Sequence, residues 1–363
     1  MCQENFNNIS DKIIENEKIE EKAEQEYSNP AKPPQFVSFP PYGFTPQTFE
    51  EKREIKRTAL TIGISFIALT AVVLLLNIVQ AALMKIVSEI LPNKYYIFQD
   101  AAVLQSIQII FSILAFTVPF IVVYKFFNFR ISDLISFKKP EKNTFLPFLL
   151  FGIGFCAFAN IAVSQAGAIF ESFGIDYNVV QLENPNGFFG FMLSFIATVV
   201  TPALVEEFAC RGLILGSLRK FGDGFAIIVS SILFGLLHGN FEQIPFAFLV
   251  GLVLGFITVK SGSIWIAAAV HGFNNFISVA FNYFLYKLST LQQNAVYTGF
   301  LCVSLLLGIF AFLLLKSKEE LYNIEKSKME CTEKQKYKWF FSSVAISVFV
   351  VLSLLEALMF FVL

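Results

Sequence analysis

The chain has 363 residues, a formal net charge of −1 and a composition that is 55% hydrophobic, with 45 Phe. Charged residues make up only 15% of it, against roughly 25% in soluble domains, and the mean hydropathy is +0.64. This composition predicts a polytopic membrane protein whose partner is the lipid bilayer, and it gives no reason to expect a nucleic-acid partner. The five cysteines include no C-x-x-C pair, so neither a disulfide framework nor a zinc ribbon is expected.

The first 57 residues differ from the rest of the chain. An acidic stretch opens them, and a stretch rich in proline and aromatic residues follows from Pro30 to Pro46. Segments of this kind usually lack a core of their own. We expect residues 1–57 to form a largely disordered cytosolic tail, with a docking segment for a partner as the alternative. Because the first apolar run begins only near Thr58, no cleavable signal peptide is expected.

Nine apolar runs follow this tail. A helix needs roughly 17–25 residues to cross a bilayer, so we expect an all-α transmembrane bundle with about nine spans, eight being the alternative. The runs 225–239 and 244–260 are the least certain and could pack as a tight helical hairpin. Glycines such as Gly235 and Gly251 favour the close approach of helices in lipid. The nine runs are 58–84, 101–124, 145–170, 187–207, 225–239, 244–260, 263–285, 296–315 and 339–362.

The membrane part divides into three regions by its motifs. Residues 58–186 supply the N-terminal helices, residues 187–285 carry the polar motifs, and residues 286–363 supply the C-terminal helices with a Lys-rich loop at 316–338. With the N-terminus in the cytoplasm, 24 of the 27 Lys and Arg residues lie on the inner side. The positive-inside rule therefore predicts a cytosolic N-terminus and, with nine spans, an external C-terminus.

The first polar motif is a pair of glutamates at the end of an apolar run. Side chains four residues apart share one face of a helix, so Glu207 can pair with Arg211. Glu206 is rotated by about 100° around the helix and can point elsewhere. In a soluble protein such a pattern is usually a surface ion pair. An ionised side chain at the centre of a membrane helix costs roughly 2.5–3.5 kcal/mol, so here a functional role is the default hypothesis.

Two further motifs contain the only two histidines of the chain. Phe234 and His238 share one helical face, which would pack an aromatic ring beside the imidazole. His271 and Asn275 share another face, with Asn274 beside them. A lone histidine on an apolar helix is most often a satisfied core residue. An imidazole and a carboxamide on one stripe could also bind a metal or stabilise an oxyanion.

The three motifs together suggest hydrolytic chemistry. Two histidines and one glutamate form the ligand set of a catalytic zinc site with an open position for water, and the candidate ligands are Glu206, His238 and His271. The same residues could work without a metal, with a glutamate as general base on water. No H-E-x-x-H helix is present, so a metal site would have to be assembled across helices.

The ordered motifs E-E-x-x-x-R, F-x-x-x-H and H-x-x-x-N resemble those of the CAAX prenyl protease and bacteriocin-processing family. Its members are also called Abi or CPBP intramembrane metalloproteases. The resemblance covers residues 187–285 and includes the flanking sequences T-P-A-L-V-E-E-F-A-C-R-G and S-I-L-F-G-L-L-H-G. It implies an intramembrane endopeptidase with either one divalent metal, Zn, or a metal-free glutamate mechanism.

The resemblance also implies a role for each motif residue. Glu206 would activate the hydrolytic water together with His238, while Glu207 and Arg211 would hold the first motif in place. His271 and Asn275 would complete the site as a ligand or an oxyanion stabiliser. The predicted catalytic residues are therefore Glu206, Glu207, His238, His271 and Asn275, and the predicted positioning residues are Arg211 and Phe234.

The substrate is left open by the sequence. We expect a peptide or a membrane protein, either prenylated or bacteriocin-like, cleaved by a multi-pass protein of a bacterial cell membrane. The acidic tail and the Lys-rich loop match no motif of the prenyl proteases. A non-catalytic immunity or scaffold protein of the same fold is the first alternative. A secondary transporter is the second, although such proteins usually contain internal repeats and none is evident here.

Overall fold

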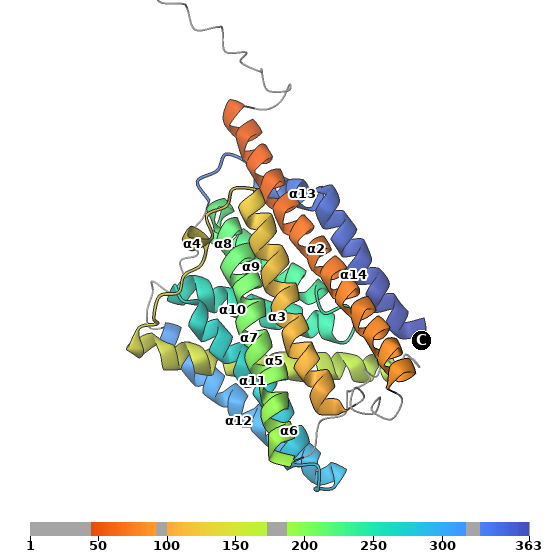
Figure 1. Ribbon diagram of the computed structural model, residues 1–363. Coiled ribbons are helices and arrows are strands. Elements are labelled where there is room, and N and C mark those ends of the chain that lie inside the picture. Colours follow the sequence, from red (N-terminus) through yellow and green to blue (C-terminus); the bar gives the residue numbers. More distant parts are fainter. Residues whose placement is uncertain (1–44, 92–99, 173–186, 317–326, 363) are drawn as a thin grey trace, which may run out of the picture. The chain divides into compact units, whose positions relative to one another are not determined.

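The computed structural model describes residues 45–91, 100–172, 187–316 and 327–362 (Figure 1). All the elements in these ranges are helices, which confirms the expected all-α fold for this part of the chain. Most of the predicted tail, residues 1–44, lies outside the described residues. The first described helix, α2 (Pro46–Ile90), begins at a proline, a residue suited to the first helical turn because that turn needs no N–H donor.

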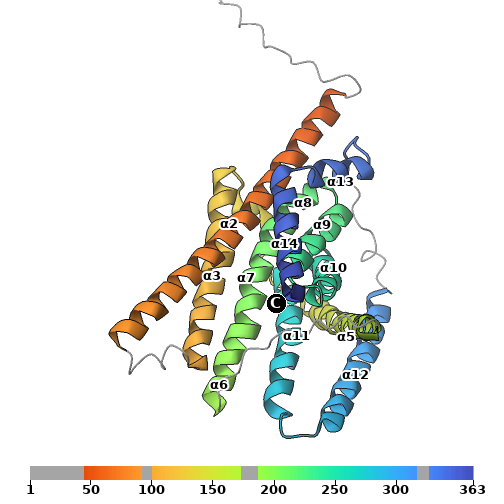
Figure 2. The same ribbon diagram turned by 90° about the vertical axis from the view of Figure 1, so that its right-hand side faces the viewer.

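Helix α2 lies between α3 (Ala101–Phe126) and α14 (Val344–Val362), as Figures 1 and 2 show. Asp100 caps α3 by accepting hydrogen bonds from the first free backbone amides of that helix. Phe66 of α2 stacks on Phe349 of α14 with ring centroids 4.2 Å apart and meets Phe120 of α3 edge-on. Aromatic packing therefore fixes the position of the long first helix against both neighbours.

Helix α5 (Lys142–Ser172) follows the short α4 (Ile131–Leu134) and crosses its neighbours steeply in Figure 1. Its contact with α12 (Thr290–Lys316) is made by two glycines, because a Cβ on Gly154 would lie 2.4 Å from the Cα atom of Gly308. Gly152 lies against Val270 in the same way. Small residues thus let these backbones touch, as the glycine pattern predicted.

Residues 187–221 form one continuous helical rod made of several segments. The predicted span 187–207 is therefore too short, and the glutamate pair lies in the middle of the rod instead of at its end. Two segments of the rod have the wider π-helical turn, which occurs often at functional sites. The segments are α6 (Gly187–Ser194), η2 (Phe195–Val200), α7 (Thr201–Glu207), η3 (Phe208–Ile214), α8 (Leu215–Leu218) and η4 (Arg219–Phe221).

The next two helices form an antiparallel hairpin. Helix α9 (Asp223–Leu236) packs on α10 (Gln243–Ser261) through glycines, as the sequence suggested. Along α9 from its C-terminal end, Gly235 meets Phe248, Ser231 meets Gly251 and Ile227 meets Gly255. In these contacts the residue numbers rise along α10 as they fall along α9, so the two helices are antiparallel. The end of α10 therefore lies at the level of the start of α9.

The remaining helices complete the bundle. Helix α11 (Ile264–Phe284) begins at Ser263, whose hydroxyl caps it by accepting a hydrogen bond from the Trp265 amide. Helix α13 (Glu333–Phe341) begins with a capping box at Thr332 and is bent by 71° from α14.

Fewer helices can cross a membrane than the nine that were expected. Seven described helices are long and apolar enough, and the bent pair α13–α14 would make eight. The run 225–239 fails because α9 has only 14 residues, or about 21 Å, against a hydrocarbon core of roughly 30 Å. Helix α10 is long enough by itself but returns along α9. By length and composition alone the described residues thus contain seven or eight candidate spans, and α10 is one of the seven.

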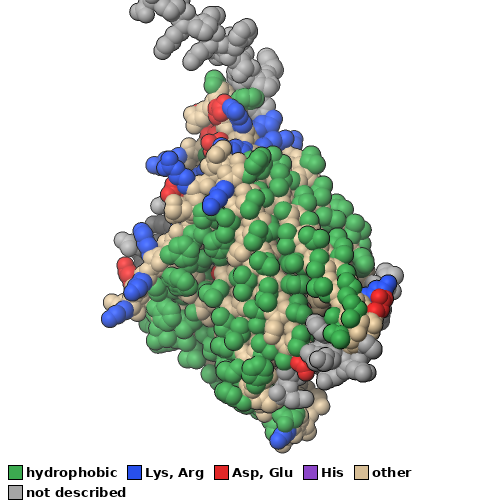
Figure 3. Space-filling model, in the orientation of Figure 1, with side chains coloured by type: hydrophobic (Ala, Val, Ile, Leu, Met, Phe, Trp, Pro, Cys, Tyr) green, Lys and Arg blue, Asp and Glu red, His purple; other side chains and the backbone are tan. Residues whose placement is uncertain are grey.

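The surface agrees with an integral, multi-pass membrane protein. Apolar side chains cover most of the face shown in Figure 3, and Lys and Arg side chains gather at its upper and left edges. Large apolar residues are exposed on the outer helices, among them Leu74, Leu75 and Ile78 of α2 and Leu306, Phe310 and Leu313 of α12. An apolar surface that extends over several outer helices suits contact with lipid.

The hairpin makes a testable prediction about topology. If α9 and α10 return to one side, Lys220 and Lys334 lie on the same side of the membrane and the C-terminus lies on the other. Cysteines at these positions, in a full-length variant without the native cysteines, can be labelled with an impermeant maleimide in oriented vesicles. We expect both lysine positions to react from the cytosolic side.

Labelling of Lys220 and Lys334 from opposite sides would show that α10 crosses the membrane alone. A tag after Leu363 is the second readout, because a C-terminus on the same side as Lys334 would mean that α14 does not cross.

Candidate active site

The depth of the site follows from the rod and the hairpin. Gly222, with a positive φ of 115° that suits glycine, makes the sharp turn between α8 and α9. This turn lies midway in sequence between Glu206 and His238. Two helical arms of equal length therefore bring the two residues to one depth, about 24 Å from the turn at 1.5 Å per residue. His238 therefore lies at the depth of Glu206, in the turn that follows a helix too short for the full span expected at 225–239.

A buried carboxylate links two of the sequence motifs. Glu207 Oε1 accepts a hydrogen bond of 2.9 Å from Arg211 Nη1 and one of 2.8 Å from His271 Nδ1. The Glu207 and Arg211 side chains are both 1% exposed. The predicted pairing within the first motif is confirmed, while the hydrogen bond to the third motif was not predicted. Both donors offset the charge of Glu207 at Oε1, while its Oε2 atom is buried without a hydrogen-bond partner among the described residues.

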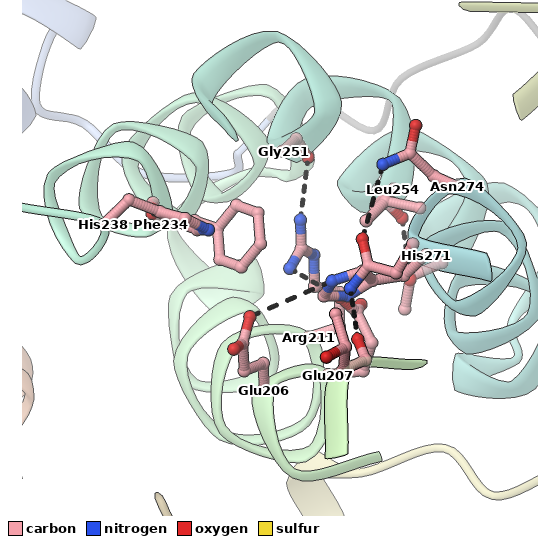
Figure 4. A network of polar contacts seen from close by, with 12 residues as sticks. Glu206, Glu207, Arg211, Phe234, His238, Gly251, Leu254, His271 and Asn274 are labelled. Carbon is pink, nitrogen blue, oxygen red and sulfur yellow. Dashed lines mark hydrogen bonds and ion pairs between the residues drawn. The ribbon is translucent and has the colours of Figure 1, made fainter. Parts of the chain in front are cut away.

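The guanidinium of Arg211 holds three helices together (Figure 4). Besides Glu207 it contacts the Gly251 carbonyl of α10, with Nη2 3.5 Å from the oxygen. It also stacks over the ring of Phe234 in α9 at 4.2 Å from the centroid, a cation–π contact. The same ring meets His238 edge-on at 5.0 Å and His271 at 5.9 Å. Phe234 therefore spaces the two imidazoles, as its predicted positioning role requires.

Glu206 has a different environment from Glu207. Its side chain is 16% exposed, and its Oε2 atom is buried without a hydrogen-bond partner among the described residues. The nearest charged or ionisable partner is His271, whose Nε2 atom lies 4.0 Å from Oε2. This gap is too long for a direct hydrogen bond.

Both histidines are held in one tautomer by their Nδ1 atoms. His271 Nδ1 donates to the Glu207 carboxylate, and His238 Nδ1 lies 2.9 Å from the Phe234 carbonyl oxygen, which can only accept. When the imidazoles are neutral, each Nε2 atom therefore carries a lone pair. Neither neutral ring can then donate a hydrogen bond to an oxyanion from Nε2.

Asn275 connects α11 to the π-helical segment η2. Its Nδ2 atom donates a hydrogen bond of 3.0 Å to the Thr198 carbonyl. Four residues further along stands Pro202, which has no N–H to offer to that carbonyl in a helix. The Asn275 side chain thus donates to the Thr198 carbonyl the hydrogen bond that Pro202 cannot donate. Its neighbour Asn274 contacts it through Nδ2 at 3.4 Å from Oδ1.

The predicted residues converge on one cavity of about 860 Å³. Both imidazoles contact the Phe234 ring. The distance between the His238 and His271 ring centroids therefore cannot exceed the sum of their distances from the Phe234 centroid. Glu207 and Arg211 are absent from the cavity lining, so the structure places them behind the site. The predicted site residues that line the cavity are Glu206, Phe234, His238, His271 and Asn275, and Asn274 joins them.

The donor groups have the chemistry of a metal site but not its arrangement. The carboxylate of Glu206 and the Nε2 lone pairs of His238 and His271 are suitable zinc ligands. Among the described residues, however, no three His, Cys, Asp or Glu side chains are placed to hold one metal ion. The residues as arranged do not fit a three-ligand zinc site, so we derive no step through a metal. Ligation by these three residues stays a prediction.

Glu356 of α14 was missed by the sequence analysis. A Cβ on Gly239, the residue after His238, would lie 2.7 Å from the carboxyl carbon of Glu356. The carboxylate therefore packs directly on the backbone of the turn that carries His238. A single carboxylate inside the apolar run 339–362 was the signal that could have identified it.

We predict that Arg211→Ala destabilises the protein strongly. Glu207 would be left buried without its cation, and breaking a buried ion pair in this way costs about 3–5 kcal/mol. The measurement is the thermal unfolding midpoint in detergent. Lys220→Ala is the matched control because its ion pair with Glu54 is exposed, with 44% and 55% of the two side chains accessible. Equal midpoints for the two variants would contradict the buried pairing.

We also predict that Gly239→Ala destabilises the His238 turn. Gly239 has a φ of 60°, and the new methyl group would clash with Glu356. Adding Glu356→Ala should restore part of the loss, because the clash disappears while a left-handed strain of about 1–2 kcal/mol remains. Gly299→Ala is the control, since nothing lies within 4 Å of its Cβ position. A double variant no more stable than the single one would refute the contact.

Comparison with known proteins places this site in a family context. Residues 188–277 match the family model described as type II CAAX prenyl endopeptidase, Rce1-like. The matched segment runs from α6 into α11 and contains all three polar motifs, so the resemblance of these motifs to the CAAX prenyl proteases is confirmed for this domain. No curated protein and no solved structure matches the chain.

Proposed function

We propose that the protein is an intramembrane endopeptidase in which Glu206 activates the hydrolytic water. The observation that carries this proposal is the contrast between two adjacent carboxylates. Glu207 is buried behind the site and binds Arg211 and His271 through Oε1, whereas Glu206 lines the cavity and has no arginine or lysine partner among the described residues. An unpaired carboxylate at membrane depth lowers stability, so its retention fits a role in chemistry.

The water would lie in the cavity between the accessible side of the Glu206 carboxylate and His271 Nε2, which is 4.0 Å from Oε2 of that carboxylate. Both groups accept hydrogen bonds, so together they can hold both protons of one water and direct its oxygen lone pair away. Glu207 orients His271 by accepting its Nδ1 proton, as carboxylates do for catalytic histidines. As the water oxygen bonds to the peptide carbonyl carbon, one water proton passes to Glu206.

The tetrahedral intermediate carries its negative charge on the former carbonyl oxygen. Because the neutral histidines only accept through Nε2, the nearby donors are carboxamides. Asn275 uses one Nδ2 hydrogen on the Thr198 carbonyl and has a second, and Asn274 also lines the cavity. We assign oxyanion stabilisation to these two residues. When the C–N bond breaks, the proton held by Glu206 passes to the leaving amine.

His238 would act from the other side of Phe234. Its Nε2 lone pair belongs to the same cavity, and the Phe234 carbonyl holds the ring in place. In this proposal the His238 Nε2 atom accepts a hydrogen bond from the leaving nitrogen while Glu206 returns its proton to that nitrogen. Its expected partnership with Glu206 is retained, while His271 is added as the histidine closest to that carboxylate.

The proposal extends to setting and substrate. The family model implies a membrane-bound peptidase, and the charge distribution favours a cytosolic N-terminus in a bacterial cell membrane. Apart from Glu206 and the histidines, the described residues that line the cavity are uncharged, and they include both carboxamides and apolar side chains, so a peptide chain is the substrate class that fits it. Both a prenylated and a bacteriocin-like peptide belong to this class.

We predict that Glu206→Gln abolishes cleavage without loss of stability. The amide keeps the shape of the side chain but cannot take a proton from water, and loss of a general base lowers rates by roughly 100- to 10,000-fold. The measurement is cleavage of a peptide library by the purified protein in detergent, read by mass spectrometry, together with the unfolding midpoint. Retained cleavage in this variant would refute the assignment of the base.

Lys220→Ala serves as the matched control, because it changes a charged residue outside the cavity and should cleave like the unaltered protein. Treatment with a chelator separates the two mechanisms: activity that survives it supports the metal-free route. Activity that is lost and then restored by zinc would overturn that route. A protein that binds peptides without Glu206-dependent cleavage would instead be the non-catalytic alternative.

A further inference from the structure

The cavity extends beyond the catalytic residues along one face of α11. His271 is followed on that helix by polar residues at intervals of three and four, which places them on a single stripe. All of them line the cavity. The stripe, which we call the α11 track, consists of His271, Asn274, Asn275, Ser278 and Asn282.

Other helices add carboxamides that face the same space. Gln108 of α3, Gln243 of α10 and Asn294 of α12 line the cavity together with Asn282. Within the part of the chain that the structure describes, none of these four side chains makes a hydrogen bond. Carboxamides offer both donors and acceptors, and so do the peptide groups of an extended chain. All four residues are exposed, so their carboxamides are accessible to a ligand that enters the cavity.

The length of the track limits the length of its ligand. From His271 to Asn282 the helix rises about 16 Å, at 1.5 Å per residue. An extended peptide advances roughly 3.3–3.4 Å per residue. The track can therefore accompany about five residues of substrate that lead away from the catalytic water.

The lining also contains a run of aromatic side chains, among them Phe246, Phe273 and Phe300. An extended peptide points successive side chains to opposite sides. One set can meet these rings while the main chain pairs with the carboxamides. A purely hydrocarbon ligand would leave the carboxamides unpaired, so a peptide is the better occupant.

We propose that the α11 track binds about five residues of an extended peptide, through its main chain, on one side of the bond that is cleaved. This inference rests on the proposed endopeptidase function and names its substrate: an internal stretch of chain. A C-a-a-X terminus offers only three residues beyond its modified cysteine. Such a substrate would leave the distal part of the track, at Asn282 and Asn294, empty.

Charge repulsion from Glu206 also favours a long substrate over a short one that ends in a free carboxylate. Three extended residues reach about 10 Å, so a free C-terminal carboxylate at that position would lie within about 10 Å of the Glu206 carboxylate. At an effective dielectric constant of 20, two like charges at this distance repel by an amount that lowers affinity roughly tenfold. A longer substrate moves its terminal charge away from Glu206.

The test is a series of peptides that share one cleaved sequence and carry two to eight residues on each side of the bond. Each peptide is made with a C-terminal acid and with a C-terminal amide, and kcat/KM is measured with the full-length protein in detergent. We expect kcat/KM to rise at least tenfold up to about five residues on one side and then to level. The amide should be preferred among the short peptides.

Two variants locate the effect on the track. Asn282→Leu removes a distal carboxamide with little change in volume and should lower kcat/KM several-fold for long peptides but leave three-residue peptides unaffected. Asn77→Leu makes the same change on α2, outside the cavity. It should leave kcat/KM unchanged for both long and three-residue peptides. Equal effects of Asn282→Leu on short and long peptides would overturn the track.

The outcomes separate this inference from the function on which it rests. Cleavage that depends on Glu206 but is fastest with three residues and a free carboxylate would overturn the track and leave the endopeptidase standing. Absence of any cleavage that depends on Glu206 across the series would overturn both.

Discussion

The arrangement of the site depends on one buried carboxylate. Glu207 accepts hydrogen bonds from Arg211 on its own rod and from His271 on α11, so a single side chain joins two of the three motifs. Arg211 then reaches Gly251 and Phe234 and thereby fixes the hairpin α9–α10 against the rod. In a medium of low dielectric constant, such a charge is tolerated only when all of these contacts are made. The helices are therefore held in one relative arrangement by the need to satisfy it.

This constraint explains why two neighbouring glutamates behave so differently. The helix points their side chains in different directions, and only Glu207 bonds Arg211 and the Nδ1 atom of His271. Glu206 is left facing the cavity near a histidine that Glu207 has already oriented. The Glu207–Arg211 pair and the proposed reactive group, Glu206, are thus adjacent in sequence. The pair fixes the helix, and the helix in turn holds the Glu206 side chain toward the cavity.

The hairpin has an equally physical basis. A helix of 14 residues cannot cross a bilayer, but its end is deep enough to deliver His238 to the level of Glu206. The non-helical turn that follows is acceptable at this depth because protein surrounds it and a polar cavity adjoins it. Gly239 takes the left-handed conformation there, and the Glu356 carboxylate of α14 covers it. The C-terminal helix, far away in sequence, thereby becomes part of the support of a site residue.

The sequence by itself determined the features that depend on composition and on spacing within one helix. Hydrophobic content predicted a membrane bundle, the i, i+4 rule predicted the Glu207–Arg211 pair and the Phe234–His238 contact, and glycines predicted where helices touch. Contacts between helices depend on their register and depth, which no local spacing encodes. Only the tertiary structure therefore decided that the rod continues past Glu207, that α9 is too short to span, that Asn275 donates to the Thr198 carbonyl, and that Glu356 contacts Gly239.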